Sequence, residues 1–490
     1  MTPAPLIQGE HQTWDAAGWQ AELWGARQAL ATTGARVVAT LLDNGPAFVA
    51  LDEAALDAGL VHVPLPPFFT SQQALHALDA AGVDTLIASP LLAAQWPQWP
   101  WTPLQVAGET LSMAHRPATP RAMPAGTVKI TFTSGTTGQP KGVCLGREAL
   151  DAIASGLVQA LGPLGIERHL SVLPYAVLLE NVAGSMAARR QGATLVSLPT
   201  AQVGLSGSSR FDPATFDRAV RVLDVQSVIL LPQMLRAWCG WLAHTRQRAH
   251  PGLRFVAVGG AAVGAPLLAQ AKALGVPAFE GYGLSEGASV QTLNLPGAER
   301  AGSAGRALPH AQLRISPSGE IEVRGSLNLG YLGDPTPVPD WWPSGDLGRI
   351  DDDGFLFIEG RRKNVLITAY GRNVSPEWIE TTLAGEAAIA QAVVMGEGRV
   401  HLSAVIWPTP LAGTLPAAAI ASAVERANAR LPDYARIGAW TVGELASDLA
   451  GGLFTPNGRP VRERVLARYG PDLMPPVTDS GAANATATAP

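Results

Sequence analysis

The sequence predicts an α/β fold, with a large N-terminal domain of helix-covered, mainly parallel sheets, a small β-rich subdomain and a small α+β C-terminal domain. Helix-like and strand-like segments alternate from Ala16 to Ala88, and the alternation recurs across residues 150–198 and 216–231. Strands separated by helices of this length are typical of parallel sheets, because a parallel crossover needs about a dozen residues or more. The chain of 490 residues is also longer than one hydrophobic core usually supports, so at least two domains are expected.

The first elements follow from the spacing of apolar residues. The segment WDAAGWQAELWGARQAL, residues 14–30, places them at helical intervals, and ARVVATLL, residues 35–42, is a short β-branched run. The segment LDEAALDAGLVHVPL, residues 51–65, repeats a helix and then a strand. Between Val323 and Ile358 the pattern changes to short strands with Gly, Pro and Asp turns, which predicts the β-rich subdomain.

We expect the domain boundary in the polar segment GRRKN, residues 360–364, which follows the strand-like FLFIE. Beyond it, AVVMGEGRVHLSAVIW is interpreted as two strands joined by a Gly-containing turn, and AAAIASAVERANARL as a helix that ends before Pro432. The predicted domains are therefore residues 1–362 and 363–475. Residues 476–490 are small, polar and low in complexity, so we expect a disordered tail.

Composition excludes several classes of protein. The chain is 47% hydrophobic and 15% charged, which is typical of a packed globular protein. A formal net charge of −5 without basic runs gives no electrostatic basis for nucleic-acid binding. No stretch reaches the roughly 18 apolar residues of a membrane span, and the N-terminus has no signal-peptide pattern. Two cysteines fit a reducing compartment, so we expect a cytoplasmic protein without an integral membrane segment.

The strongest functional signal is ITFTSGTTGQPKGV, residues 130–143, where a strand-like start leads into glycines, hydroxyl side chains and a lysine. Glycines allow backbone N–H groups to approach phosphate oxygens, hydroxyls add donors, and Lys141 supplies a compact positive charge. The segment is not a Walker A loop, because Lys141 is followed by Gly142 rather than by Ser or Thr. From these residue types alone, a flexible turn is the alternative.

The ten-residue string TSGTTGQPKG resembles the phosphate loop of the adenylate-forming superfamily, which contains acyl-CoA synthetases, peptide-synthetase adenylation domains and beetle luciferases. Similar motifs continue in order over nearly the whole chain, closest to those of medium- and long-chain fatty acyl-CoA ligases. The resemblance implies a C-terminal domain that is mobile and rotates between two half-reactions. It also implies that the phosphates of ATP are bound by Thr133, Ser134, Gly135, Thr136, Thr137, Gly138 and Lys141.

Two later segments resemble the family's motifs around the nucleotide base, FVAVGGAAV and GYGLSEG. The first is similar to the adenine-edge loop, and in the second the resemblance implies that Tyr282 stacks on adenine. It further implies that Ser285 binds near the α-phosphate and that Glu286 helps to hold Mg²⁺, a hard ion that prefers oxygen ligands. The cofactor-binding candidates here are Gly259, Gly260, Ala261, Gly281, Tyr282 and Gly283.

The segment SGDLG, residues 344–348, resembles the ribose-binding motif, with Asp346 as the acceptor for both ribose hydroxyls. Taken alone, an aspartate before a turn is usually a turn-former. In GRRKN the resemblance implies that Arg361 also reaches the ribose and that Lys363 is the hinge residue. The segment GRNVSPEWIE resembles the loop that enters the site for thioester formation, with Gly371 beside the pantetheine arm.

The chain departs from the family at FTPNGRPVRERV, residues 454–465. The family places its catalytic lysine one residue after Asn-Gly, whereas this chain has Arg459 there and no lysine beyond Lys363. Arginine keeps a positive charge and can hold carboxylate and phosphate bidentately, but it is bulkier and differently shaped. Two explanations stay open. We favour functional replacement, because the other ATP motifs are intact, over loss or attenuation of adenylation.

The segment LPYAVLLEN, residues 173–181, resembles one wall of the acyl pocket, with Tyr175 and Val177 as candidate lining residues. Its apolar character favours an apolar or fatty acid, although ordinary core packing explains the same pattern. The resemblance implies Mg²⁺- and ATP-dependent formation of an acyl-AMP with release of pyrophosphate, followed by acyl transfer to coenzyme A. The alternatives are transfer to the phosphopantetheine of an acyl carrier protein partner or to an amine, and a nucleotide-binding protein that no longer adenylates. A kinase-like phosphotransferase would also use a Gly-rich phosphate loop, but the sequence lacks the Asp–Asn catalytic loop expected of one.

Overall fold

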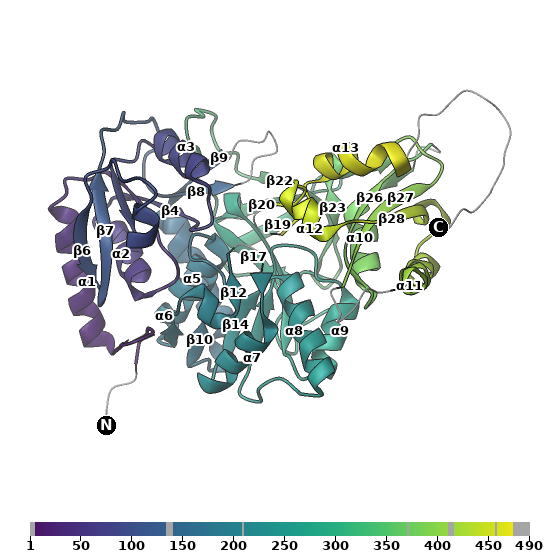
Figure 1. Cartoon of the computed structure of the whole chain (residues 1–490), viewed down its shortest axis with the longest axis horizontal. Helices are drawn as coiled ribbons and strands as arrows, with labels where there is room; N and C mark the ends of the chain where they lie inside the picture. The colour runs from purple at the N-terminus through teal and green to yellow at the C-terminus, as the bar shows by residue number, and fades with distance from the viewer. Residues whose placement is uncertain are drawn as a thin grey trace. The chain divides into compact units, whose positions relative to one another are not determined.

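The computed structural model describes residues 5–133, 141–207, 210–369, 372–409, 416–455 and 458–473 (Figure 1). The chain divides into two compact units, Met1–Arg362 (unit 1) and Lys363–Pro490 (unit 2). Helices and mixed β-sheets build both units, which confirms the predicted α/β fold class. Within the described ranges, no helix is both long enough and apolar enough to cross a bilayer.

Sheet I of unit 1 is parallel at its centre and antiparallel at both edges. In spatial order its described strands are β18 (Arg306–Ala307), β17 (Ser289–Leu293), β16 (Ala278–Leu284), β15 (Phe255–Val258), β14 (Ser227–Leu230), β10 (Arg168–Leu170), β11 (Thr194–Val196), β1 (Ile7–Gln8) and β2 (Thr13–Trp14). The pairs from β16 to β1 are parallel, whereas β17, β18 and β2 pair antiparallel. The predicted parallel crossovers account for the centre of the sheet, and the antiparallel edges are added by hairpins.

Sheet II of unit 1 has the same mixed character. In spatial order its described strands are β21 (Gly330–Tyr331), β9 (Lys141–Gly146), β8 (Thr127–Thr133), β4 (Val61–Leu65), β3 (Val37–Leu41), β5 (Thr85–Ala88), β7 (Glu109–His115) and β6 (Thr102–Val106). The strands β8, β4, β3 and β5 run parallel, and the remaining pairs are antiparallel. The β8–β9 hairpin therefore lies next to the parallel centre of the sheet.

Two smaller sheets complete the strands of unit 1. Sheet III is antiparallel and consists of β19 (Ala311–Ile315), β20 (Glu320–Gly325), β22 (Trp342–Ile350) and β23 (Leu356–Arg361). It is the β-rich subdomain predicted between Val323 and Ile358, and it begins one strand earlier than predicted. A short hairpin pairs β12 (Leu205–Ser206) with β13 (Arg210–Phe211).

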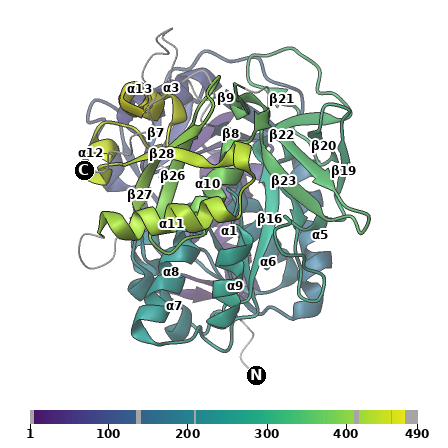
Figure 2. The same cartoon turned by 90° about the vertical axis from the view of Figure 1, so that its right-hand side faces the viewer.

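The helices of unit 1 form layers outside and between sheets I and II (Figures 1 and 2). They are α1 (Ala16–Ala31), α2 (Pro46–Asp57), α3 (Ser71–Ala81), α4 (Pro90–Ala93), α5 (Arg147–Leu161), α6 (Ala187–Gln191), α7 (Pro213–Val222), α8 (Pro232–Thr245) and α9 (Ala265–Ala273), with the short turns η1 (Gly162–Leu164), η3 (Thr200–Val203) and η4 (Ser285–Gly287). The segment η2 (Leu179–Met186) is a π-helix, a conformation that is rare and often found at functional sites.

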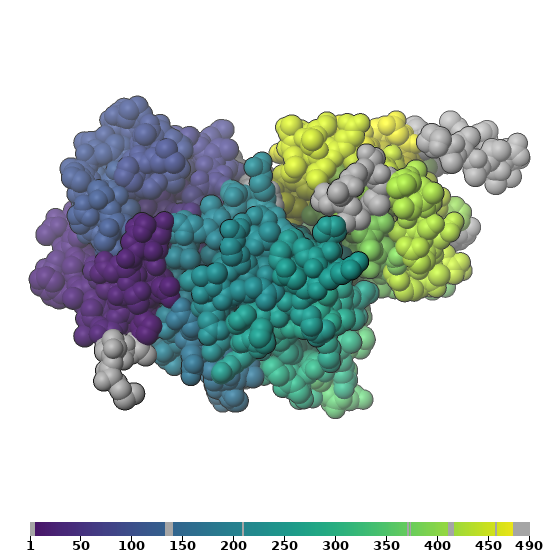
Figure 3. Space-filling view, turned by 60° about the horizontal axis from the view of Figure 1, so that its bottom comes forward, coloured from purple at the N-terminus to yellow at the C-terminus, as the bar shows by residue number. Residues whose placement is uncertain are grey.

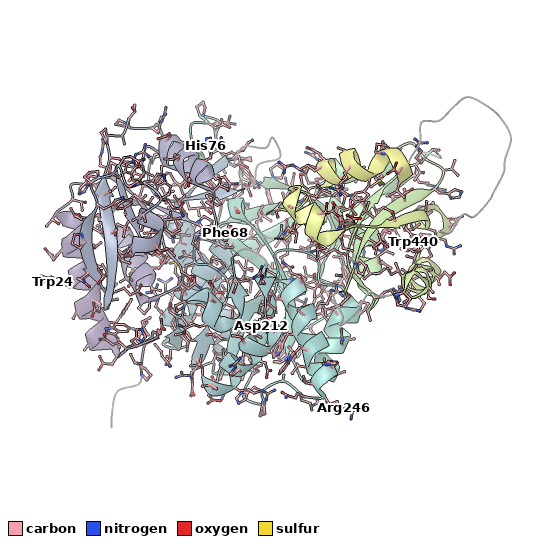
Figure 4. All side chains as sticks on the ribbon, viewed as in Figure 1. Trp24, Phe68, His76, Asp212, Arg246 and Trp440 are labelled. Atoms are coloured by element: carbon pink, nitrogen blue, oxygen red, sulfur yellow. The ribbon has the colours of Figure 1, made fainter. Side chains whose placement is uncertain are left out.

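Alternating strand residues explain this layering. Phe255 of β15 packs with Ile153 of α5 and Leu145 of sheet II in one buried cluster, so α5 lies between the two sheets. The next residue, Val256, points to the opposite face and packs with α7, α8 and α9. In the space-filling view the purple and blue residues lie directly against the teal ones (Figure 3). On the outer side of α1, Trp24 points away from the core and is 64% exposed (Figure 4).

Unit 2 is a sheet covered by helices on both faces. Its elements are η5 (Arg362–Asn364, beginning at the last residue of unit 1), β24 (Leu366–Ile367), β25 (Asn373–Val374), α10 (Pro376–Ala384), β26 (Ile389–Met395), β27 (Leu402–Pro408), α11 (Ala417–Ala429), η6 (Asp433–Ala435), β28 (Ile437–Val442), α12 (Leu445–Ala450) and α13 (Arg462–Leu473). Val394 of β26 packs with α10 and α11, whereas its neighbours Val393 and Met395 pack with Val465 of α13. The predicted pair of strands with a Gly-containing turn is the antiparallel pair β26–β27.

Candidate active site

The predicted phosphate loop connects the two strands of the β8–β9 hairpin. Thr133, the last residue of β8, pairs with Lys141, the first residue of β9. The predicted loop residues Ser134, Gly135, Thr136, Thr137 and Gly138 lie outside the described residues, as does the side chain of Thr133. The hairpin therefore places both ends of the loop at neighbouring strand ends of sheet II, with an exposed lysine at the loop's exit.

A segment far away in the sequence, residues 328–331, holds Glu286. Its carboxylate Oε1 accepts a hydrogen bond of 2.7 Å from the hydroxyl of Tyr331. Its backbone carbonyl accepts bonds from Asn328, at 2.7 Å from the backbone N–H and 3.1 Å from the side-chain amide. Ser285 precedes it in η4 and is half-buried. Sequence analysis did not identify Asn328 or Tyr331, because no spacing rule links them to a residue more than 40 positions earlier.

Glu286 fits the chemistry of a magnesium site. Mg²⁺ usually keeps several waters and binds one or two protein carboxylates together with the phosphates of its substrate. Glu286 offers one half-buried carboxylate with an oxygen already fixed by Tyr331. In the described part of the chain, no group of three or more His, Cys, Asp or Glu residues is arranged to hold a metal by itself. A carboxylate that shares the ion with phosphates is therefore the arrangement that these residues support.

Tyr282, Asp346 and Arg361 form one cluster at the edge of sheet III. The Tyr282 hydroxyl donates to Asp346 Oδ2 at 2.7 Å, and Arg361 Nε lies 2.7 Å from Oδ1. Pairing of β22 with β23 sets Asp346 directly opposite Arg361. Burial and the neighbouring Asp346 raise the pKa of Tyr282, so its hydroxyl stays protonated and donates. The structure thus brings together three of the residues predicted for the nucleoside.

Ser344 positions the backbone of this cluster. Its hydroxyl donates to the carbonyl of Ile321 at 2.6 Å and accepts from the N–H of Asp346 at 3.0 Å. Both bonds need only a hydroxyl, which the serine side chain supplies. The predicted stacking of the Tyr282 ring on adenine stays a prediction.

The predicted adenine-edge residues Gly259, Gly260 and Ala261 follow β15 directly. Gly259 is buried, and the next two residues are exposed. A Cβ atom added at Gly259 would lie 3.3 Å from the carbonyl oxygen of Gly281 and 4.0 Å from Leu179 Cδ2. The loop after β15, the GYGLSEG motif and the end of the predicted pocket wall are therefore neighbours in space.

The glycines of GYGLSEG also have a packing role. A Cβ atom at Gly283 would lie 2.2 Å from the carbonyl oxygen of Ser289, and one at Gly281 would lie 2.9 Å from that of Thr292. Both clashes involve the backbone of β17, where a register shift interrupts the β16–β17 pair. Glycine is thus required at these two positions by strand pairing itself.

Glu280, on the neighbouring strand β16, holds the predicted adenine-edge loop in place. It is buried, and its carboxylate accepts a hydrogen bond of 3.0 Å from the N–H of Val263. Burial raises the pKa of Glu280 to about 7 from an ordinary value of 4.5, although the bond from Val263 opposes this rise. Glu280 is therefore a titrating group near neutral pH, directly beside Gly281.

Unfolding of unit 1 should depend on pH through Glu280. The folded state holds this proton more tightly than the unfolded chain, so the free energy of unfolding should fall as pH rises from about 4.5 to about 7. Glu280→Gln keeps an oxygen acceptor for Val263 without the charge. It should remove this slope and be more stable than the wild type at pH 8 by on the order of 2–3 kcal/mol. Urea midpoints at pH 5 and pH 8 test this, and equal pH slopes in both proteins would contradict it.

The predicted pocket wall is partly core. Tyr175 is 1% exposed and packs against Phe48, and its hydroxyl oxygen lies within hydrogen-bond distance of Ser171 Oγ, at 3.0 Å, and of Ser197 Oγ, at 2.8 Å. Val177 is half-buried. These surroundings agree with the core alternative for Tyr175, and its role as a pocket residue stays a prediction, as does that of Val177.

Glu180 fixes this wall from inside the π-helix η2, and sequence analysis missed it. Its Oε2 accepts bonds from the N–H groups of Val172 at 3.2 Å and Leu173 at 3.0 Å. His169 Nε2 lies 3.1 Å from Oε1, and His169 Nδ1 lies 2.9 Å from Ser227 Oγ. The only signal in the sequence was a glutamate inside an apolar run.

A buried charged network supports the strand that leads to the phosphate loop. Lys129 of β8 lies 2.8 Å from Asp52 Oδ1 of α2, and both residues are at most 2% exposed. Lys129 also donates to Asn181 of η2, whose amide donates to Asp52 at 3.0 Å. Burial opposes ionisation of Asp52, but Lys129 and His62 hold its pKa well below the usual range.

His62 completes the network as a neutral ring. Burial lowers the pKa of His62 despite its contact with Asp52. Its Nδ1 donates to Asp52 Oδ1 at 2.6 Å, and its Nε2 accepts from the hydroxyl of Thr40 at 2.8 Å. The network therefore links sheet II, α2 and η2 through satisfied polar groups.

The remaining predicted residues belong to unit 2. Lys363 is exposed in η5, and Gly371 lies outside the described residues. Arg459 is exposed, and its backbone exchanges hydrogen bonds with Thr455, from Thr455 N–H to the Arg459 carbonyl at 2.7 Å and from Arg459 N–H to Thr455 Oγ1 at 3.1 Å. Gln391 of β26 donates to the carbonyl of Gly458 at 3.0 Å. The described neighbours Thr455 and Gln391 therefore fix the backbone at Gly458 and Arg459, and the catalytic role of Arg459 stays a prediction.

Comparison with known proteins assigns both units. Residues 27–331 match the model of the AMP-binding enzyme family, and residues 363–473 match that of the AMP-binding enzyme C-terminal domain. The long-chain-fatty-acid–CoA ligase FadD15 of Mycobacterium bovis is 31% identical over 326 residues, 57% of this chain and 54% of that protein. The indoleacetate–CoA ligase of Aromatoleum aromaticum is 31% identical over 345 residues, 64% of this chain and 63% of that protein.

A solved structure shares the whole fold. The o-succinylbenzoate CoA synthetase of Bacillus subtilis in complex with its acyl-adenylate intermediate has a TM-score of 0.74 and 21% identity, over 94% of this chain and 95% of that one. The chain spans about half the length of the first curated relative. Because the family model covers residues 27–331, well over half of the sequence, the chain belongs to the AMP-binding enzyme family.

Proposed function

We propose that this chain is an acid–thiol ligase that activates a carboxylic acid as an acyl-AMP and then transfers the acyl group to coenzyme A. The observation that carries the proposal is the arrangement around Tyr331, which contacts the Glu286 carboxylate with its hydroxyl and the Lys141 ammonium with its ring. A cation and a metal-binding carboxylate around one side chain suit a metal-bound triphosphate. The cluster of Tyr282, Asp346 and Arg361 supplies an acceptor for the ribose hydroxyls.

In the first half-reaction, an oxygen of the substrate carboxylate forms a bond to the α-phosphorus of ATP. The bond from that phosphorus to the bridging oxygen breaks, and pyrophosphate leaves with the electron pair. Lys141, the loop donors and Arg459 offset the negative charge that develops. Bound Mg²⁺, held by Glu286, would neutralise phosphate charge. In the second half-reaction, the sulfur of a thiol bonds to the acyl carbon, the thiol proton is lost, and AMP leaves.

An apolar acid is the proposed substrate class. The wall segment 173–179 carries no charged side chain, and the half-buried Val177 and Leu179 are apolar. The named relatives include ligases for a long-chain fatty acid and for indoleacetate, which are both largely apolar acids. An apolar pocket binds such acids through burial of their hydrocarbon surface.

Acid-dependent exchange of labelled pyrophosphate into ATP tests the proposal. Exchange that requires an apolar acid, followed by thioester formation when coenzyme A is added, supports the complete reaction. Exchange without thioester formation would move the acceptor to a carrier-protein phosphopantetheine or an amine. ATP binding without exchange for any acid would show that adenylation has been lost.

Substitutions of Arg459 distinguish functional replacement of the family's catalytic lysine from loss of adenylation. If arginine has taken over the lysine's task, Arg459→Ala should lower exchange by about a hundredfold or more while sparing thioester formation from supplied acyl-AMP. Arg459→Lys should also lose activity, because a point charge cannot reproduce a bidentate guanidinium contact. Exchange rates of the wild type and both variants decide the matter. A gain with lysine would indicate a decayed site, and equal rates in all three would remove Arg459 from the mechanism.

A further inference from the structure

The segment from Asn328 to Tyr331 donates hydrogen bonds to both the backbone and the side chain of Glu286. Asn328 is 3% exposed and donates to the backbone carbonyl of Glu286 through both its N–H and its side-chain amide. Tyr331 donates to carboxylate Oε1 at 2.7 Å. Backbone and carboxylate are thus fixed by residues only three positions apart, so the side chain of Glu286 is held at both ends.

The same tyrosine contacts the lysine at the exit of the phosphate loop. Strand β21 pairs antiparallel with β9, and this register sets Tyr331 opposite Val143, two residues after Lys141. Lys141 Nζ lies 5.3 Å from the centre of the Tyr331 ring, within the range of a cation–π contact. The ring also makes an edge contact with Trp342, at 5.9 Å between ring centres. Backbone pairing and a neighbouring indole therefore hold the ring in place.

We propose that Tyr331 is a positioning residue of the metal–phosphate site. Its hydroxyl occupies Oε1 of Glu286 and so presents Oε2 to Mg²⁺, while its ring orients the ammonium of Lys141. The inference rests on the proposed function and adds to it a residue outside every motif identified from the sequence. One neutral side chain contacts both an anion and a cation, so it can order the two charged groups without adding charge of its own.

This arrangement predicts separate roles for the hydroxyl and for the ring. Because Tyr331 already fixes one carboxylate oxygen of Glu286, this side chain loses less rotational freedom when it binds a metal ion. Loss of the Tyr331 hydroxyl should therefore weaken metal-dependent binding of ATP. Loss of the ring should in addition disturb Lys141, whose proposed contact with phosphate does not require a metal ion. Tyr331→Phe deletes the hydroxyl and keeps the ring, whereas Tyr331→Leu deletes both.

Calorimetric titration of the full chain with ATP, in MgCl₂ and in EDTA, tests the inference without relying on turnover. The ratio of the two affinities should fall about tenfold in Tyr331→Phe, with the affinity in EDTA unchanged. Tyr331→Leu should also bind ATP more weakly in EDTA. A wild-type ratio in Tyr331→Phe, or an equal loss under both conditions, would overturn the proposal. Because Tyr331→Phe is the conservative variant, it carries the test even if Tyr331→Leu does not fold.

Tyr469→Phe is the matched control. The Tyr469 hydroxyl likewise donates to a carboxylate, that of Asp448, at 2.8 Å. Its removal should lower the stability of unit 2 and leave the Mg²⁺ dependence of ATP binding unchanged. A comparable fall in that ratio in the control would overturn the assignment to Tyr331. Failure of the proposed function is distinguishable, because the wild type itself would then bind no ATP or show no acid-dependent exchange.

Discussion

Glu286→Gln should lower acid-dependent pyrophosphate exchange by about a hundredfold or more, while the protein stays folded. The substitution keeps the size of the side chain and an oxygen that can accept from Tyr331, so the local structure has little reason to change. It removes the negative charge that a hard divalent cation requires. The exchange rate at saturating ATP and acid, measured over a range of Mg²⁺ concentrations, gives the size of the effect.

Glu322→Gln provides the comparison for this experiment. Glu322 lies on β20 and pairs with Arg314 across sheet III at 2.6 Å, so it loses the same charge without contacting the proposed site. Its exchange rate should match that of the wild type. If Glu286→Gln also stays within about threefold of the wild type, a difference of under ~1 kcal/mol, Glu286 is not the metal ligand.

Asp52→Ala should destabilise unit 1 by about 3–5 kcal/mol, because it leaves the Lys129 ammonium buried without its counter-charge. The double variant Asp52→Asn with Lys129→Met removes both charges together. It should recover more than half of the lost free energy, since a buried ion pair contributes little net stability over neutral groups of similar size. Urea unfolding of the wild type and both variants measures these differences.

Asp57→Ala is the control on the same helix. Asp57, the last residue of α2, is exposed and pairs with Arg27 and Arg147. Removing an exposed ion pair should cost under ~1 kcal/mol. Equal losses for Asp52→Ala and Asp57→Ala would show that the buried network does not hold the charge of Lys129. A double variant no more stable than Asp52→Ala would show instead that the polar contacts, and not the unpaired charge, determine stability.

Sequence patterns predicted the parts of the fold that depend on short-range order. The alternation of helices and strands, the β26–β27 pair and the β-rich sheet III all follow from periodicities and turns within about 40 residues. The candidate nucleoside cluster was also predicted, because Tyr282, Asp346 and Arg361 each lie in a recognisable motif.

Other features depend on pairings that no local pattern encodes. Tyr331 reaches Glu286 only because β21 adds to the edge of sheet II. Lys129 lies in the run VKITF, where alternation would place a lysine toward solvent, yet it is fully buried against a carboxylate 77 positions earlier. The π-helix η2 has no sequence signal of its own, and its Glu180 is explained by the backbone N–H groups that it satisfies.

Because β16 lies so close to β17, the two glycines Gly281 and Gly283 of the GYGLSEG motif do not by themselves indicate nucleotide binding. Gly281 and Gly283 are demanded by the backbone of the neighbouring strand, whether or not a nucleotide is ever bound. A related chain without catalytic activity would still need both glycines, because a side chain at either position would disturb the β16–β17 pair. Ser285 and Glu286 are under no such packing demand. Substitutions at these two positions, with the glycines unchanged, would therefore indicate a family member that has lost its activity and kept its fold.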